Sequence, residues 1–196
     1  MFGKMMVPQR TSQGISVLPL ESLSFEQRTI YIDGEINDEM AAEFVKQIIM
    51  LNRMDAHKTI KVLIMSAGGS VIHGLAMYDA ICTSTAPIDT YCIGTAYSMA
   101  AILFVAGRKR FLLEHSKIML HEPLIENGYM GSASSIKSMS DSLQDTKKQL
   151  STILCKHTGK DLEEMNQAIN YDHYFSAAEA VDFGLADEII GLDRVI

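Results

Sequence analysis

Ser98 occupies a position from which a hydroxyl group can attack a substrate. It begins a predicted helix directly after a predicted strand, so its oxygen lies at a helix N-terminus, where the helix dipole favours developing negative charge. A serine at such a position also serves as an ordinary helix N-cap. The residue alone therefore leaves two interpretations open, a nucleophile and a cap.

His121 is the histidine best placed to act as a base for that serine. It follows the predicted strand 117–120, at the edge where the carboxyl ends of parallel strands meet. Asp172 lies in a polar loop, where a carboxylate can orient an imidazole or simply form a turn. The other histidines fall in predicted loops or on polar helix positions, where we expect surface side chains: His57, His73, His115, His157 and His173.

A second strand-to-helix turn carries two glycines, in the run Ser66-Ala67-Gly68-Gly69-Ser70. Glycines let backbone N–H groups approach a ligand closely, and the following helix N-terminus adds positive potential. The turn thus suits an oxyanion or a phosphate, although a tight turn without any ligand explains the same residues. No GxxxxGK[ST] run occurs in the sequence, which excludes a Walker-type phosphate loop.

The elements that must position these residues alternate between strand and helix, which predicts an α/β domain with a largely parallel sheet. We expect residues 1–27 to form a mostly irregular arm with a short helix near 20–25. The remaining residues, 28–196, then form one domain. The predicted strands are 29–32, 59–65, 88–93, 109–113, 117–120 and 185–190. The predicted helices are 37–53, 70–82, 97–106, 134–157 and 176–183.

Composition narrows the class of protein. The 196 residues are 47% hydrophobic, which is typical of a globular domain, and the longest clean apolar run, 99–106, is far too short to span a bilayer. A net charge of −7 disfavours nucleic acid and anionic membranes as partners. The three widely spaced cysteines fit a reducing compartment and show no metal-ligand spacing. We therefore expect a cytoplasmic protein without a secretory signal or a bound metal.

Four runs of sequence, in their order and separation, resemble the Clp protease proteolytic subunit, the ClpP family. They are GGSVIHGLAMYDAI, GTAYSMAAILFVAG, KIMLHEPL and DHYFSAAEAVDFGLAD, and the resemblance extends from about residue 27 to residue 190. It implies a ClpP/crotonase-like ββα spiral with a protruding handle at about 122–158. The VPQRTSQG run resembles the axial arm of that family.

The resemblance also implies a function for the candidate residues. Ser98 would be the nucleophile, His121 the general base and Asp172 the orienting acid of a serine endopeptidase. The backbone N–H groups of Gly69 and Met99 would form the oxyanion hole. Two stacked heptameric rings would enclose the sites, and a separate AAA+ unfoldase would use ATP to feed unfolded polypeptides. No cofactor is implied for the chain itself.

Several positions depart from the family pattern and suggest a divergent paralogue. Ala67, Tyr97, Ala100 and Glu122 replace a proline, a small residue, a glycine and a glutamine, and 125–129 is longer than the usual loop. Lys61 and Leu63 stand where tyrosines of the unfoldase-docking pocket are common. One alternative is therefore a catalytically impaired structural or regulatory subunit of a mixed Clp barrel, in which a companion paralogue binds the unfoldase. Another is an acyl-CoA lyase or hydratase of the crotonase type, for which the chain is short.

Overall fold

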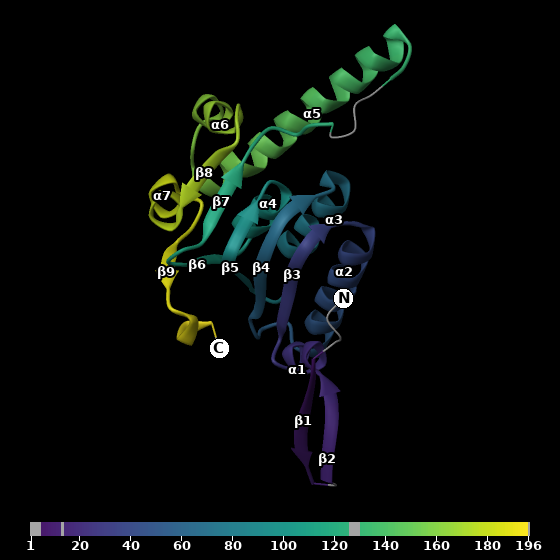
Figure 1. Cartoon of the computed structure of the whole chain (residues 1–196), viewed down its shortest axis with the longest axis vertical. Coiled ribbons are helices and arrows are strands. Elements are labelled where there is room, and N and C mark those ends of the chain that lie inside the picture. The colour runs from purple at the N-terminus through teal and green to yellow at the C-terminus, as the bar shows by residue number, and fades with distance from the viewer. Residues whose placement is uncertain (1–4, 13, 126–129, 196) are drawn as a thin grey trace.

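The protein is an α/β domain built around one mixed sheet (Figure 1). The structure, a computed structural model, describes residues 5–12, 14–125 and 130–195. Within these residues the sheet has the strand order β3-β4-β5-β6-β9, all parallel, while β7 continues alongside β5 and β8 pairs antiparallel with β7. Its strands are β3 (Thr29–Ile36), β4 (Ile60–Gly69), β5 (Ile88–Tyr97), β6 (Lys109–Leu113), β7 (Lys117–Leu120), β8 (His173–Ser176) and β9 (Glu188–Ile190). The predicted α/β class and largely parallel sheet are confirmed.

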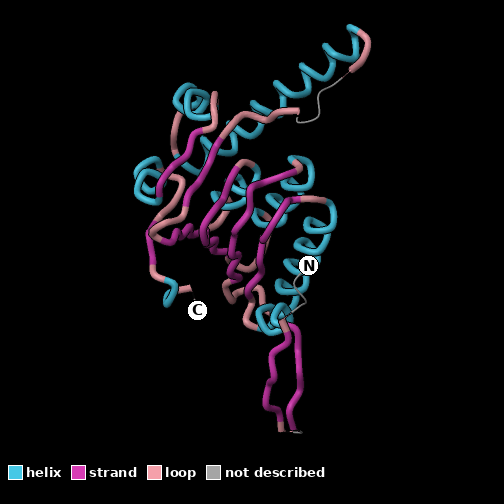
Figure 2. The backbone as a smooth tube through the Cα atoms, in the orientation of Figure 1, coloured by secondary structure: helices cyan, strands magenta, loops and turns pink. Residues whose placement is uncertain are grey.

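Helices cover one face of this sheet, as Figure 2 shows by its cyan coils behind the magenta strands. The helices are α1 (Leu20–Glu26), α2 (Asp38–Met54), α3 (Val71–Cys82), α4 (Met99–Val105), α5 (Ala133–Thr158), α6 (Leu162–Ile169) and α7 (Ala177–Phe183). Every residue of α4 is buried. A short helix with no solvent-exposed face must lie within the core, so its packing fixes the end of the turn that leads into it.

The long helix α5 leaves the body of the protein (Figure 1). Its C-terminal half anchors it, since Leu150 and Leu154 are buried in the core, and Gly159 ends it with φ 75°. Towards its N-terminus Ile136 is 50% exposed. The predicted helix is confirmed, and its apolar stripe is only partly covered within one chain.

Local capping signals predicted several helix ends correctly. Asn37 accepts a hydrogen bond from the Met40 backbone N–H, and Ser176 and Glu179 form a capping box at the start of α7.

The C-terminus of α2 has a cap that sequence patterns did not reveal. The buried Arg28 donates from its guanidinium to the carbonyls of Leu51, Asp55 and Lys58, at 3.0, 2.8 and 2.8 Å.

The mostly irregular arm predicted for residues 1–27 is wrong for its described part. Strands β1 (Met6–Thr11) and β2 (Gly14–Pro19) pair antiparallel and project from the body as a hairpin (Figure 1). The apolar residues Ile15 and Val17 alternate over only two positions and are exposed, so no buried face marks the strands in the sequence. The predicted short helix is confirmed as α1.

Other element boundaries also needed correction. β3, β4 and β5 each extend four residues past their predicted ends. A register shift between Asp33 and Glu35 lets the glycine run of β4 keep pairing with β3, and the end of β5 pairs with β7. Two elements were not predicted from sequence patterns, namely α6, which is capped by Asp161, and β8, which is mostly exposed. No helix among the described residues is long and apolar enough to cross a membrane.

His157 is not the surface side chain that its polar helix position suggested. It is partly buried, and its Nε2 lies 2.9 Å from the hydroxyl of Tyr78 on α3, with the two rings edge to face at 5.8 Å. Burial lowers the pKa of His157, and the neighbouring Lys156 and Arg110 lower it further. The neutral imidazole can thus accept a hydrogen bond from the Tyr78 hydroxyl in the folded state.

This burial predicts a loss of stability in mild acid. Below the ordinary histidine pKa of about 6.5 the unfolded chain binds a proton that the folded chain refuses, so the free energy of unfolding falls as the pH falls through this range. Urea titrations of the wild type and of His157→Gln between pH 7.5 and 5 measure the effect. The glutamine keeps an acceptor for Tyr78 without titrating, and its variant should show the shallower slope. Equal slopes would show that His157 does not contribute.

Candidate active site

Ser98 sits on a backbone turn that few residues tolerate. It links β5 to α4 with φ 53° and ψ −124°, a positive φ that is costly for any residue with a Cβ. Its N–H is held by the Met119 carbonyl at 2.8 Å. Although Ser98 occupies the N-cap position of α4, its side chain makes no capping hydrogen bond. Its Oγ instead lies 2.7 Å from Nε2 of His121.

The pairing of β7 with β8 brings Asp172 towards the same histidine. The antiparallel register pairs Leu120 with His173, so the next residues along, His121 and Asp172, face one another beyond the strand ends. Nδ1 of His121 lies 3.7 Å from Oδ1 of Asp172, which is an ion-pair distance but too long for a hydrogen bond. The Asp172 side chain is 60% exposed, whereas that of His121 is 17% exposed.

The glycine run at the end of β4 lies directly beside the serine turn. A Cβ on Gly68 would be 2.8 Å from the Cβ of Ser98 and 3.1 Å from the backbone nitrogen of Met99. Gly69 has φ 143°, and a Cβ there would lie 2.8 Å from the backbone nitrogen of Ile36. Only glycine permits these two contacts. The two turns that the sequence analysis singled out are therefore adjacent, with backbone nitrogens near the serine.

A groove of about 540 Å³ opens in front of Ser98 and His121. The lining includes the carboxylate of Glu35 and is otherwise uncharged or apolar. Its remaining residues are Ala67, Gly69, Ser70, Val71, Met119, Pro123 and Leu124. Behind Ser98 is a narrow apolar slot of about 20 Å³ between α4 and the buried end of α5. The groove can admit an extended chain, and the slot can take little more than a methyl group without side-chain movement.

Two comparisons with known proteins give matches over most of the chain. A sequence model of the Clp protease family matches residues 13–193. The ATP-dependent Clp protease proteolytic subunit of Ligilactobacillus salivarius (strain UCC118) is 37% identical over 186 residues, which is 94% of this chain and 93% of that protein.

The chain belongs to the Clp protease family. Members of this family are serine peptidases, so the groove belongs to a hydrolase and the crotonase-type alternative is excluded. Among the described residues no group of three or more His, Cys, Asp or Glu side chains could hold a metal ion.

The departures from the family pattern leave the serine and histidine aligned. The ring of Tyr97 packs edge to face on Tyr174 of β8, with centroids 5.6 Å apart, and Tyr97 does not line the groove in front of Ser98. Ala100 is fully buried in α4. Glu122 forms an ion pair with Lys147 of α5 at 2.5 Å, which ties the end of β7 to that helix. The longer loop lies mainly at 126–129, outside the described residues.

Lys61 and Leu63 contact the C-terminal segment of this Clp family chain. The Lys61 ammonium donates to the carbonyl of Val195 at 2.7 Å, and Val195 is 5% exposed in an apolar cluster with Leu63 and Tyr91. One of the three ammonium donors is thus paired with a backbone oxygen, and Lys61 is only half-buried.

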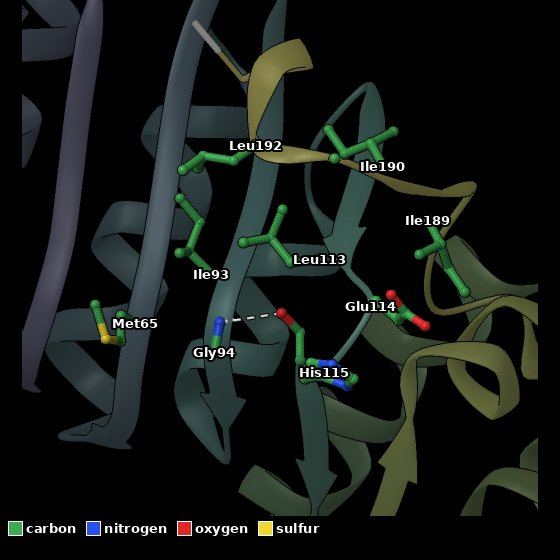
Figure 3. Close-up of a pocket in the computed structure, with 11 residues that line it drawn as sticks. Met65, Ile93, Gly94, Leu113, Glu114, His115, Ile189, Ile190 and Leu192 are labelled. Atoms are coloured by element: carbon green, nitrogen blue, oxygen red, sulfur yellow. Dashed lines mark hydrogen bonds between the residues drawn. The ribbon is translucent and has the colours of Figure 1, made fainter.

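An apolar hollow of about 740 Å³ continues from this cluster, apart from Ser98 and His121 (Figure 3). Apolar and polar side chains line it: Met65, Ile93, Leu113, Ile189 and Leu192, together with Glu114 and His115. A hollow of this composition suits an apolar side chain of another molecule. The hollow and the groove share no lining residue.

Replacing Gly69 with alanine should strongly destabilise the end of β4. The new Cβ would lie 2.8 Å from the Ile36 nitrogen and closer still to its carbonyl oxygen, in addition to the strain of φ 143°. We expect a loss of about 2–4 kcal/mol in unfolding free energy. Gly34→Ala is the matched control, because Gly34 has φ 100° but nothing within 4 Å of a Cβ. Equal losses in urea titrations would contradict the close approach of Gly69 to Ile36.

Proposed function

We propose that this chain is an endopeptidase subunit that hydrolyses unfolded polypeptides with a triad of Ser98, His121 and Asp172. The observation that carries the proposal is the 2.7 Å contact between the Ser98 Oγ and His121 Nε2, made by a serine that the strained turn prevents from capping its helix. A base at this distance can remove the hydroxyl proton as the oxygen attacks.

The proposed reaction uses the groups in a fixed order. The Ser98 oxygen attacks the substrate carbonyl carbon while His121 takes its proton, and the resulting oxyanion accepts hydrogen bonds from the backbone N–H groups of Gly69 and Met99. His121 then protonates the leaving amine, and the acyl-enzyme forms. Water repeats the sequence and releases the acid. Each oxyanion donor typically contributes about 3 kcal/mol.

In this proposal Asp172 fixes the imidazole tautomer and stabilises the imidazolium. At 3.7 Å its carboxylate lies in ion-pair range of Nδ1, and a shift of less than 1 Å would form the hydrogen bond. The alternative of a catalytically impaired subunit is not favoured, since neither Tyr97 nor Glu122 displaces the serine or the histidine.

We also propose the assembly that the family suggests. Residues 1–27 form an axial arm, residues 28–196 the protease domain, and about 122–158 the handle that joins two heptameric rings. The exposed Ile136 on the projecting half of α5 supports contact with another chain. The relative from Ligilactobacillus salivarius is named as ATP-dependent, and a separate AAA+ unfoldase would supply that ATP-driven step.

For the unfoldase we propose a companion ring. Val195 occupies the cluster around Leu63 and Tyr91, and Lys61 holds it there, so an apolar loop of a partner could reach only the adjacent hollow and not this cluster. In a mixed barrel a companion paralogue would bind the unfoldase while this ring contributes proteolytic sites. The chain would need no cofactor of its own, and its free thiols at Cys82, Cys92 and Cys155 fit a cytoplasmic location.

Ser98→Ala should abolish peptide hydrolysis and labelling by a fluorophosphonate probe while assembly is retained. The hydroxyl is the only group of the side chain that the proposed reaction uses, so activity should fall below a few per cent of wild type. Fluorogenic peptide turnover and gel fluorescence measure the two effects. Ser138→Ala, on the exposed part of α5, should label as wild type does. Probe labelling that survives in Ser98→Ala would refute the nucleophile.

Charges on the handle should separate the rings. Met139→Asp combined with Leu143→Asp places carboxylates on the apolar stripe of α5, and burying them between rings would be strongly unfavourable. Sedimentation should then show single rings with low peptidase activity. The control, Ser140→Asp with Gln144→Asp, adds the same charge at exposed positions one residue along the helix. A double ring with Met139→Asp and Leu143→Asp present would contradict the proposed interface.

A further inference from the structure

Glu35 is the one carboxylate among the described residues that line the groove in front of Ser98. His121 is the only other titratable side chain of that lining, and the remaining eight residues are neutral. The Glu35 side chain is exposed and has no hydrogen bond or ion pair with any described residue. The nearby acidic residue Glu122 differs, since it is neutralised by Lys147.

The position of Glu35 is set by the same bulge that places the glycines. The β3–β4 register pairs Asp33 with Met65 but Glu35 with Gly68, so β4 carries one extra residue between these pairs. Ser66 fixes the bulge by donating from its Oγ to the Gly34 carbonyl at 2.5 Å and accepting from the Gly68 N–H at 3.0 Å. A bulge re-aims the side chains beside it, and here it puts Glu35 next to the glycine run.

From this arrangement we infer that Glu35 is a specificity-determining residue that favours substrates with a cationic group near the cleaved bond. The inference rests on the proposed function, because it takes the groove as the place where the peptide lies. A peptide that fills the groove removes water from an unpaired carboxylate, which is unfavourable unless a positive charge replaces that water. The same removal of water strengthens the attraction to a cation.

Two chemical groups on a peptide could supply the charge. One is the side chain of lysine or arginine, and the other is a free N-terminal ammonium group. Both groups would pair with the Glu35 carboxylate. An N-terminal ammonium group requires the peptide to begin inside the groove, whereas a lysine or arginine side chain does not. An acidic residue at the same place would be disfavoured, because two carboxylates would share a partly dehydrated groove. The groove thus discriminates by attraction and by repulsion.

The test compares peptides that differ in one charge. A neutral fluorogenic peptide, blocked at both ends, receives lysine or glutamine at each of three positions on either side of the cleaved bond. A second pair differs only in a free or acetylated N-terminus. For the assembled wild type we expect kcat/KM for one lysine position, or for the free N-terminus, to exceed its neutral counterpart about threefold to fivefold. This ratio should decline at high ionic strength.

Variants assign the preference to one side chain. Glu35→Gln should bring the ratio to about one, and Glu35→Lys should reverse it in favour of a glutamate peptide. Asp33→Asn is the matched control: it removes the same charge from the same strand, two residues away and outside the groove lining. A cationic preference absent from the wild type, or present in Glu35→Gln, would overturn the inference. So would an equal loss of preference in Asp33→Asn.

A binding measurement separates this inference from the proposed function. Fluorescence anisotropy of the same labelled peptides on assembled Ser98→Ala reports the charge preference without any cleavage. If the wild type cleaves no peptide while Ser98→Ala binds the cationic one about threefold more tightly through Glu35, the proposed function fails and the specificity stands. If cleavage is normal and neither assay shows a Glu35-dependent preference, the specificity is wrong and the proposed function stands.

Discussion

The candidate site depends on how closely the end of β4 approaches the turn between β5 and α4. Gly68 has no side chain, and any Cβ there would collide with Ser98. That approach lets Ser98 keep a positive φ, because the buried helix α4 on one side and the glycines on the other leave the turn no room to relax. A strained residue held in this way has its hydroxyl free of the local helix and available to His121.

Two further contacts extend this constraint to the rest of the chain. The antiparallel pairing of β7 with β8 makes His121 and Asp172 neighbours although 50 residues separate them in the sequence. The ion pair of Glu122 with Lys147 joins the residue after His121 to the handle helix, close to where α5 enters the core at Leu150. A displacement of α5 therefore acts on the strand end that carries the histidine, and β7 also holds the Ser98 N–H through the Met119 carbonyl.

Sequence patterns predicted the parts of this arrangement that local chemistry determines. Asn37 and Ser176 begin helices because their side chains complete hydrogen bonds within four residues, and the apolar stripe of α5 repeats at helical spacing. Ser98 and His121 were identified next to strand ends and Asp172 in a polar loop, but their proximity needed either the family resemblance or the fold. The hairpin of β1 and β2 and the exposed strand β8 lack a buried face, so no periodicity marked them. Glu35 was not identified, because nothing in the sequence distinguishes it from other exposed glutamates. Its place in the groove lining depends on the bulge between β3 and β4, which sequence patterns did not predict.

The bulge at Ser66 also divides β4 into two segments with different surroundings. Before it, Lys61 and Leu63 hold the C-terminal segment, and Met65 borders the apolar hollow. After it, Ala67 and Gly69 line the groove in front of Ser98. Because Ser66 is tied to Gly34 on β3 and to the N–H of Gly68, the second segment is fixed by contacts that do not involve the first. Lys61 and Leu63 can therefore differ from the family pattern, and the surface they form can change its partner, without moving the glycines on which the serine turn depends.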